Sequence, residues 1–368
     1  MKIVIVTTFF PPHVGGLEVI AQQQAETLTS AGHEVCVITG RHSRELASSE
    51  WTEEGYRIIR LPVFNAIENR TGIPYPIIGI SAIKTYWREC GTADYIHVHD
   101  TFYLTSQIAS LIATMRHRPL HVTQHVGIVE HPNRAVMMVQ SFIYKAISSH
   151  LWKSAETVTV YNSHVRDFLR NRGVDKNKIL ETYNGIDIRR FKPVSPGCRR
   201  ELRESLGLAV DRPLVLFVGR LVPKKGYLEL LAAASPEFDI LVVGPGKQPE
   251  SYPDTVHFLG SIDRREILAL YQACDIFALP SDGELFTLAM QEAMACGLPI
   301  VTTNDSRYED YDLDRSLIQL VDRQPEAIRE AILRVISDPN LAMGMADYGR
   351  HLAMTRFDWH RHGGSSRA

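Results

Sequence analysis

The amino-acid sequence predicts an α/β protein built of two doubly wound domains, each with a parallel sheet between layers of helices. Short runs rich in valine, isoleucine and leucine alternate with longer amphipathic segments along the whole chain. These runs are continuously apolar, which is typical of parallel strands covered by helices on both faces. The length of 368 residues suits two domains of ordinary size.

The predicted strands divide into two series separated by a linker. The first series is 2–8, 34–39, 56–63, 95–99, 120–125, 157–162 and 179–184; the second is 214–219, 240–244, 256–260, 276–280, 299–303 and 316–321. Between them, Pro193, Pro196 and Gly197 are expected to break any helix. We therefore predict one domain over residues 1–192 and another over 198–355, facing a central cleft. In such sheets ligands bind at the carboxyl ends of the strands.

The composition argues against several classes of protein. Forty Lys and Arg residues against 42 Asp and Glu give a formal charge of −2, without the basic excess of a nucleic-acid binder. No apolar run is long enough to span a bilayer, and residues 2–8 are predicted to be a buried strand rather than a signal peptide. Five scattered cysteines with no C-x-x-C pair predict neither a disulfide framework nor a zinc site. We therefore expect a cytoplasmic protein.

The first candidate binding loop follows the first strand. Gly15 and Gly16 precede a helix that is predicted to begin near Leu17. Paired glycines at such a turn allow backbone N–H groups to approach an anion at the helix N-terminus, although a plain tight turn would look the same. The pattern is not G-x-G-x-x-G, which disfavours a nicotinamide-dependent dehydrogenase.

The second candidate loop follows the strand at 214–219. The sequence FVGRLVPKKG places Arg220, Lys224 and Lys225 just before a helix predicted to start near Gly226. Cations beside a helix N-terminus can clamp a diphosphate through charge-assisted hydrogen bonds. A solvated Lys-Lys turn is the alternative, and the position at a strand end favours the clamp.

The third and strongest candidate is the segment LPSDGELFTLAMQEAMACGLPIVTT, which begins at Leu279. A strand ends there, and a helix is predicted from about Phe286 to Cys296. Glu284 precedes that helix, and Glu292 lies within it among apolar residues. Two acids on a helix usually mark a solvated face, but an acid in an apolar helix is expected to need a partner.

Taken together, these motifs resemble the nucleotide-sugar-dependent glycosyltransferases of family 4, which have the GT-B fold. The resemblance covers nearly the whole chain. It rests on GGLE from Gly15, HVHD from His97, TQHVG from Thr123, YNGID from Tyr183, FVGRLVPKKG from Phe217, ALYQACDIFALPS from Ala269, and the Glu284–Glu292 span ending EAMACGLPIV. FDWHRH, from Phe357, is similar to the start of the family's last helix, which crosses back to the first domain from about residue 356.

The resemblance implies a role for each candidate residue. Arg220 and Lys225 would neutralise the departing diphosphate, Glu292 would accept hydrogen bonds from the ribose, and Glu284 would bind the transferred sugar. His125, after a first-domain strand, would contact the sugar near the reacting carbon. Donor contacts are also implied for Gly15, Gly16, Gly219, Leu285, Phe286, Thr287 and Leu288.

The resemblance further implies retention of configuration and no metal, because Arg220 and Lys225 stand where other glycosyltransferases hold a metal ion. A UDP- or GDP-linked hexose is the expected donor, and a glycan or lipid-linked acceptor of cell-envelope or exopolysaccharide synthesis is the expected partner. His97 and His99 alternate onto one strand face, where packing is favoured over metal ligation.

The chain departs from the family pattern at two loops. Leu285 and Thr287 replace glycines that lie against the donor phosphates, and an acid-rich segment from Thr302 replaces a Gly-Gly-x-x-Glu loop. These differences leave two alternatives open: a GT-B nucleotide-sugar epimerase and a donor-binding subunit without turnover. The segment from Asn133 is either a buried helix or a basic amphipathic helix that contacts a membrane surface.

Overall fold

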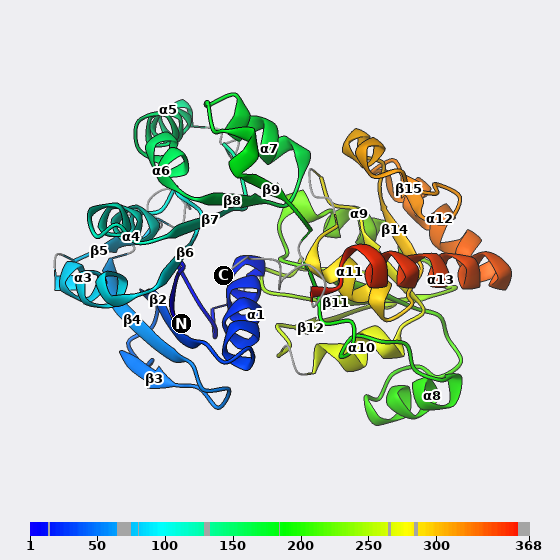
Figure 1. The fold of residues 1–368 in the computed structure, drawn as a ribbon. Coiled ribbons are helices and arrows are strands. Elements are labelled where there is room, and N and C mark those ends of the chain that lie inside the picture. The colour runs from blue at the N-terminus through cyan, green and yellow to red at the C-terminus, as the bar shows by residue number, and fades with distance from the viewer. Residues whose placement is uncertain are drawn as a thin grey trace. The chain divides into compact units, whose positions relative to one another are not determined.

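The fold is described from a computed structural model covering residues 1–13, 15–64, 75–79, 81–128, 133–183, 185–263, 266–282 and 286–359, with the side chains of residues 307, 309 and 310 excepted. The described chain divides into two compact units, residues 1–183 and 185–359 (Figure 1). Each unit contains its own twisted, mostly parallel sheet, as the sequence predicts.

The sheet of the first unit has the strand order β3-β4-β2-β1-β6-β7-β8-β9, with β5 paired to β4. The strands are β1 (Lys2–Val6), β2 (Glu34–Arg41), β3 (Ser49–Trp51), β4 (Arg57–Phe64), β5 (Ile77–Ile78), β6 (Tyr95–His99), β7 (Leu120–Gln124), β8 (Thr157–Val160) and β9 (Ile179–Glu181). All pairs are parallel except those of β4 with β3 and with β5. These two short strands are absent from the sequence prediction.

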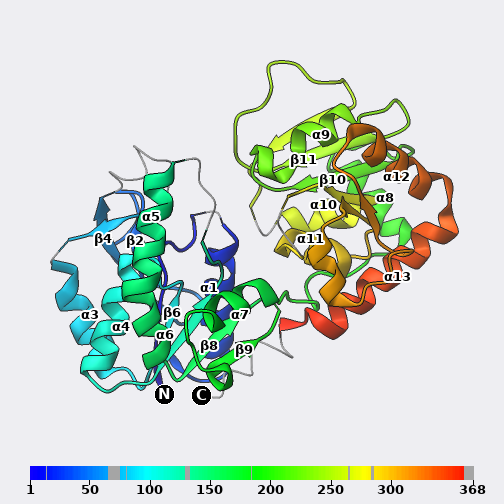
Figure 2. The ribbon, with the colours of Figure 1, turned by 90° about the horizontal axis from the view of Figure 1, so that it is seen from above.

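Helices cover both faces of this sheet. They are α1 (Gly16–Ser30), α3 (Ser81–Thr92), α4 (Leu104–Met115), α5 (Arg134–Ile143), α6 (Ser149–Ser154) and α7 (Ser163–Arg170), with a π-helical turn at Tyr144–Ser148 and a 3-10 turn at Lys176–Lys178. Helix α1 lies on one face, and α3 and α4 lie on the other (Figures 1 and 2). The two apolar cores follow this division, because alternate residues of β1 enter one core or the other.

The second unit repeats the plan with the strand order β12-β11-β10-β13-β14-β15. Its strands are β10 (Leu214–Val218), β11 (Asp239–Val243), β12 (Val256–Gly260), β13 (Ile276–Leu279), β14 (Ile300–Thr303) and β15 (Gln319–Val321). Its helices are α8 (Pro196–Ser205), α9 (Tyr227–Ala232), α10 (Ile267–Ala273), α11 (Leu288–Ala295), α12 (Pro325–Ser337) and α13 (Pro339–Arg356), with 3-10 turns at Pro223–Lys225 and Ser306–Tyr311. Every strand pair in this sheet is parallel.

The boundary between the units differs from the predicted one. Residues 185–192 belong to the second unit rather than the first, because they bond to its elements. Ile186 pairs with Asp358 after α13, Gln272 of α10 donates to the Lys192 carbonyl, and Arg350 of α13 donates to the Phe191 carbonyl. The segment predicted to cross back from about residue 356 begins in the second unit, because Phe357 and Trp359 exchange backbone hydrogen bonds with Ile186; its remainder, from residue 360, lies outside the described residues.

The predicted linker is also a helix start. Ser195 caps α8 by accepting a hydrogen bond from the Cys198 N–H, and Pro196 occupies the first helical turn. Proline is favoured at that position because its missing N–H would have no helical partner. The prediction that Pro196 and Gly197 break the helix was therefore wrong.

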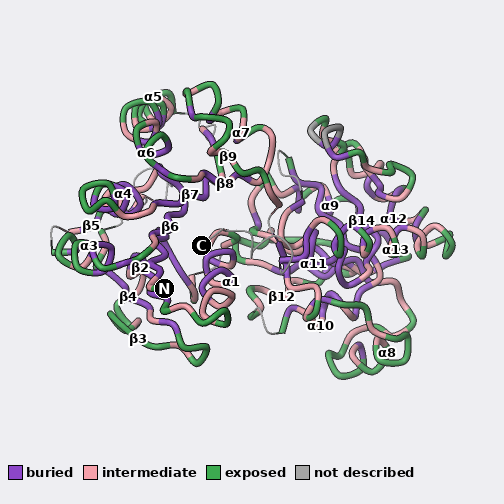
Figure 3. Tube along the Cα trace, in the orientation of Figure 1, coloured by how far each residue is buried: buried purple, intermediate pink, exposed green. Residues whose placement is uncertain are grey.

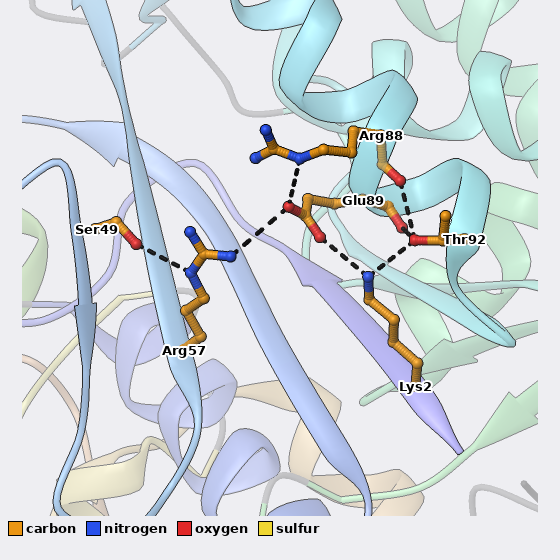
Figure 4. A network of polar contacts seen from close by, with 6 residues as sticks. All are labelled: Lys2, Ser49, Arg57, Arg88, Glu89 and Thr92. Atoms are coloured by element: carbon orange, nitrogen blue, oxygen red, sulfur yellow. Dashed lines mark hydrogen bonds and ion pairs between the residues drawn. The ribbon is translucent and has the colours of Figure 1, made fainter.

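A buried carboxylate joins the amino ends of the first unit's strands to α3. Glu89 receives hydrogen bonds from Lys2 Nζ at 3.1 Å and Arg88 Nε at 2.9 Å, and Arg57 Nη1 lies 3.9 Å away (Figure 4). Burial alone raises the pKa of Glu89, but the bonds from Lys2 and Arg88 outweigh it and hold the pKa below its ordinary value. This network lies at the amino ends of the strands, whereas the Gly15–Gly16 loop and His125 of the same unit follow the carboxyl ends of β1 and β7.

Candidate functional site

In the first unit, His125 follows directly after β7, as predicted. The side chains of β6, β7 and β8 alternate between an apolar face and a polar face of the sheet. The sequence prediction treated these strands as continuously apolar, like the others. Their apolar residues enter the core beneath α3 and α4. The other face carries His97, His99, His121, Thr123, Thr157 and Thr159.

A chain of hydrogen bonds crosses this polar face and ends at His125. Gln24 of α1 is central to it: its Nε2 lies 2.5 Å from His97 Nδ1, and its Oε1 lies 2.9 Å from His99 Nε2. His97 Nε2 lies 2.7 Å from Thr123 Oγ1. His99 Nδ1 lies 3.0 Å from His125 Nε2, so the chain runs from Thr123 to His125.

The backbone of His125 is held separately. Its N–H donates to Asp100 Oδ1 at 3.0 Å, and the Gln124 side-chain amide donates to the same oxygen at 2.8 Å. Asp100 has a positive φ of 53°, an unusual backbone conformation for a residue with a side chain. Burial raises the pKa of Asp100 to about 7. The loop that carries His125 is thus fixed by a buried carboxyl group.

The histidines of this face are neutral at physiological pH. Burial lowers the pKa of His121 to about 4 and that of His125 to about 3. Burial, and then the neighbouring imidazoles, hold the pKa values of His97 and His99 well below the ordinary range. Within the described part of the chain, no group of three or more His, Cys, Asp or Glu side chains can hold a metal ion. His97 and His99 are buried, stacked on each other and hydrogen-bonded through their ring nitrogens.

These shifts predict that the first unit loses stability in mild acid. An unfolded histidine binds a proton below about pH 6.5, whereas the folded ones resist, so the unfolding free energy falls as pH drops from 6.5 toward 4. His121 and His125 each cost about 2 kcal/mol at pH 5. Asp100 changes the unfolding free energy in the opposite direction, because its raised pKa lets the folded state bind a proton below about pH 7. This gain offsets the loss from about one histidine.

Urea denaturation followed by tryptophan fluorescence at pH 7.5 and 5.0 measures this effect, because three of the four tryptophans (Trp51, Trp87 and Trp152) lie in the first unit. We expect a lower midpoint at pH 5.0 and a smaller pH effect in His121→Asn. Equal midpoints at both pH values would contradict the burial of neutral histidines.

Gly15 and Gly16 lie at the start of α1, as predicted. Gly15 is the N-cap, and a Cβ there would lie 2.2 Å from Glu18 Oε2. Glu18 also pairs with His13, with 2.6 Å between Oε1 and Nδ1. The Glu18 carboxylate therefore lies against Gly15 at the positive end of the helix, and Gly16 is exposed beside it.

In the second unit, the loop after β10 places its cations as the sequence suggests. Arg220 is exposed, and with the described residues its guanidinium forms no hydrogen bond or ion pair. The Lys225 side chain lies beside Gly219, where an added Cβ would be 3.6 Å from Lys225 Cδ. Gly226 has a φ of +71°, and a Cβ there would lie 2.0 Å from the Pro280 carbonyl oxygen. The loop thus packs closely against the carboxyl end of β13.

Glu292 has the partner that the sequence analysis expected it to need. It lies on α11, is buried, and accepts a hydrogen bond from the Tyr271 hydroxyl of α10 at 2.9 Å. One carboxylate oxygen is thereby oriented by the protein, and the carboxylate can accept further bonds. Glu284 and Leu285 lie outside the described residues, so their predicted positions stay predictions.

The replacement of glycine by Thr287 has a local explanation. Thr287 has a φ of −54°, needs no glycine, and caps α11 by accepting a bond from the Met290 N–H at 3.3 Å. Its hydroxyl proton can still be donated to a ligand. Leu288 is the first residue of α11. The departure at Thr287 is therefore compatible with a well-formed helix N-terminus.

Phe286 carries the unusual conformation instead. Its φ is +40°, and its ring packs against Tyr308, Tyr311 and Phe357 with centroids 4.9–5.3 Å apart. Two of these aromatic residues come from the acid-rich segment that replaces the glycine loop. That segment therefore anchors the residue just before Thr287.

Three residues around the predicted site were not identified from the sequence. Tyr271 orients Glu292, Asp100 holds the His125 backbone, and Gln24 joins two histidines. Gln24 is a polar residue at a buried position of α1. It could have been recognised as a hydrogen-bonding residue, because a buried amide needs partners.

Comparison with known proteins agrees with this architecture. The family model described as "Glycosyltransferase Family 4" matches residues 14–190, and that described as "Glycosyl transferases group 1" matches residues 199–352. The D-inositol 3-phosphate glycosyltransferase of Xylanimonas cellulosilytica is 28% identical over 94% of this chain and 88% of its own. A GDP-mannose-dependent alpha-mannosyltransferase of Corynebacterium glutamicum is 28% identical over 82% and 72%.

Among solved structures, Anabaena HepE in complex with UDP-glucose has a TM-score of 0.74 and 20% identity, covering 98% of this chain and 96% of its own. This similarity establishes the GT-B fold. Together, the two family models account for nearly the whole chain, one for each half. The chain belongs to the family 4, group 1 glycosyltransferases.

Proposed function

We propose that the protein is a retaining glycosyltransferase that moves a hexosyl group from a nucleotide-diphosphate sugar to a hydroxyl of a glycan, glycolipid or small-molecule acceptor. The observation that carries the proposal is in the second unit, where exposed Arg220 and neighbouring Lys225 follow the carboxyl end of β10. The N-terminus of α11 follows the carboxyl end of β13, the parallel neighbour of β10. Family membership and the relatives' named substrates support it.

In this proposal Arg220 and Lys225 bind the diphosphate and stabilise the charge that develops as it leaves. Gly219, whose own N–H is donated to the Val243 carbonyl, lets the anion approach without a side chain in the way, and the capped start of α11 at Thr287 offers N–H groups to it. Glu292 accepts hydrogen bonds from the ribose hydroxyls, and Tyr271 orients it. Glu284 binds hydroxyls of the transferred sugar.

The chemistry needs no enzymic nucleophile. The bond between the anomeric carbon and the β-phosphate oxygen breaks, the acceptor oxygen bonds to the same face of that carbon, and the acceptor's proton passes to the departing phosphate oxygen. His125 contacts the transferred sugar, and Gly15 and Gly16 approach the diphosphate. Because two cations neutralise the leaving group, we propose that no metal is required.

The named relatives narrow the donor. One relative is named as GDP-mannose-dependent, and one solved structure contains UDP-glucose. We therefore propose a UDP- or GDP-linked hexose, with an acceptor from cell-envelope or exopolysaccharide synthesis.

Transfer to methanol tests the reaction type. Methanol replaces the natural acceptor and gives a methyl glycoside, whose anomeric configuration does not change in solution and is read by proton NMR. We expect the configuration of the donor to be retained, in the presence of EDTA as in its absence. An inverted glycoside would contradict the mechanism, and a changed nucleotide sugar without release would indicate an epimerase.

Glu292→Ala is expected to weaken binding of the nucleoside diphosphate by about 10- to 100-fold, the effect of removing a charged hydrogen-bond acceptor. Isothermal titration with the preferred nucleotide measures this. Glu330→Ala, an exposed acid on α12, is the matched control and should bind normally. Unchanged affinity in Glu292→Ala would place the ribose elsewhere.

We also propose that α5 contacts a membrane surface. Its outward face carries Met138 and Phe142, each 67% exposed, and Val139. Arg134 is its first residue, and the exposed Lys145 lies in the π-helical turn that follows it. Figure 3 shows the contrast with the buried central strands. Apolar residues at helical spacing flanked by cations suit an anionic lipid surface. None of the described helices has the length and apolar character to cross a bilayer.

Sedimentation with phosphatidylglycerol-containing vesicles tests this contact. The double variant Met138→Ser, Phe142→Ser is expected to lose most of the vesicle-bound fraction, whereas Met343→Ser, which removes a similarly exposed methionine from α13, should not. Binding that is equal in all three proteins would show that α5 is not the contact.

A further inference from the structure

The hydrogen-bond chain in the first unit has a direction that is set by one side chain. An amide has a carbonyl oxygen that only accepts and a nitrogen that only donates. Gln24 presents its oxygen to His99 Nε2 at 2.9 Å and its nitrogen to His97 Nδ1 at 2.5 Å. A neutral imidazole has one N–H and one lone pair, so each ring's two nitrogens have opposite roles.

The roles follow step by step from Gln24. The carbonyl accepts from His99 Nε2, which therefore carries hydrogen, so His99 Nδ1 is an acceptor. His125 Nε2, 3.0 Å from it, must then donate. On the other side, the amide N–H donates to His97 Nδ1, so His97 Nε2 carries hydrogen and donates to Thr123 Oγ1 at 2.7 Å. All three rings are thus in the Nε2–H form.

The burial of these groups makes the pattern rigid. Gln24, His97 and His99 are each less than 10% exposed, so water is not available to replace a lost partner. The His97 and His99 rings are stacked with centroids 4.8 Å apart, and His99 and His125 are stacked at 5.3 Å. Exchanging the protonated and bare nitrogens of one ring would place two donors or two lone pairs against each other, unless every member of the hydrogen-bond chain changed with it.

We propose that Gln24 is a positioning residue for His125, acting through His99 to hold the His125 ring with hydrogen on Nε2 and a lone pair on Nδ1. This rests on the proposed function in so far as His125 contacts the transferred sugar. Nδ1 of His125 has no partner among the described residues, which leaves it for a ligand. The geometry makes it an acceptor for a sugar hydroxyl and not a donor.

The tautomer is measured directly by nitrogen-15 NMR of protein labelled at its histidine rings, since protonated and bare ring nitrogens have distinct shifts. His125→Ala assigns the signal. In the wild-type chain we expect Nε2–H for His97, His99 and His125. An Nδ1–H form of His125 would overturn the proposal, and this readout needs neither activity nor a further variant.

The second arm uses Gln24→Met, which keeps the length of the side chain and removes both hydrogen bonds. We expect His125 to take both tautomers, and kcat for transfer to fall by about three- to tenfold with donor KM within twofold, because only positioning is lost. Thr159→Val is the matched control: it breaks the 2.8 Å contact with His121 on the same sheet face, without a bond to the Gln24 chain.

The outcomes separate the two levels of the argument. A single His125 tautomer in Gln24→Met, or an equal fall of kcat in Thr159→Val, would overturn the positioning role and leave the transferase proposal standing. A wild-type chain with the expected tautomers but no transfer to any acceptor would overturn the proposed function, while the assignment of the ring nitrogens would hold.

Discussion

Lys225→Met is expected to lower kcat for glycosyl transfer by about 100- to 1000-fold, the range observed when one group that stabilises developing charge is removed. The diphosphate gains negative charge as the sugar leaves, and a cation beside Gly219 stabilises that state more than the bound donor. Donor KM should therefore change less than kcat. Initial rates of nucleotide release with a saturating donor measure the effect.

Lys224→Met is the matched control, because it removes the same charge from the adjacent, exposed position. We expect it to retain most of its activity, since the proposed mechanism assigns the contact with the departing diphosphate to Lys225 and not to Lys224. Comparable losses in both variants would mean that overall charge, and not a contact from Lys225, supports the reaction.

His125→Ala is expected to leave the Kd of the nucleoside diphosphate within twofold of wild type and to lower kcat by about 100-fold. The nucleotide is assigned to the second unit, whereas His125 is assigned to the transferred sugar. Loss of an interaction made near the reacting carbon should appear in kcat. Isothermal titration and transfer to methanol give the two quantities.

The low pKa of His125, about 3, adds a further expectation. The pH–rate profile should have no histidine limb near pH 6.5, because the ring stays neutral throughout that range. His164→Ala, which removes an exposed histidine of α7, is the control and should be fully active. Weakened nucleotide binding in His125→Ala would contradict the separation of roles.

The central strands of both sheets were predictable because their signal is local. The runs that became β1, β2, β10 and β11 are continuously apolar, and that pattern reflects burial on both faces. Strands β3 and β5 were not predicted because they lack this local apolar signal. β3 is exposed throughout, and β5 has only two residues, so pairing with β4 and not composition makes them strands.

The domain boundary was not predictable because it depends on contacts distant in sequence. Pro193 and Pro196 look like a linker, yet residues 185–192 are bound by α10 and α13. A proline also gives no local indication of whether it ends a helix or, as at Pro196, begins one.

The candidate site was predictable where residues follow strand ends. Arg220 and Lys225 were identified from their position after a strand, whereas His125 was identified from the resemblance to the family. The residues that orient His125 and Glu292 were not identified, because Gln24 and Tyr271 lie on helices whose packing the sequence does not give. The need of buried Glu292 for a partner could be anticipated, but not the identity of the partner.

The most direct test of the account is a panel of UDP-, GDP-, ADP-, CDP- and dTDP-sugars in the presence of EDTA, scored by thermal stabilisation and by slow release of free nucleotide. The proposed mechanism predicts that one donor, UDP- or GDP-linked, raises the melting temperature selectively and is slowly hydrolysed without a metal, and that Lys225→Met lowers the rate of release by about 100-fold or more. The absence of both thermal stabilisation and nucleotide release with every donor would contradict the proposed mechanism.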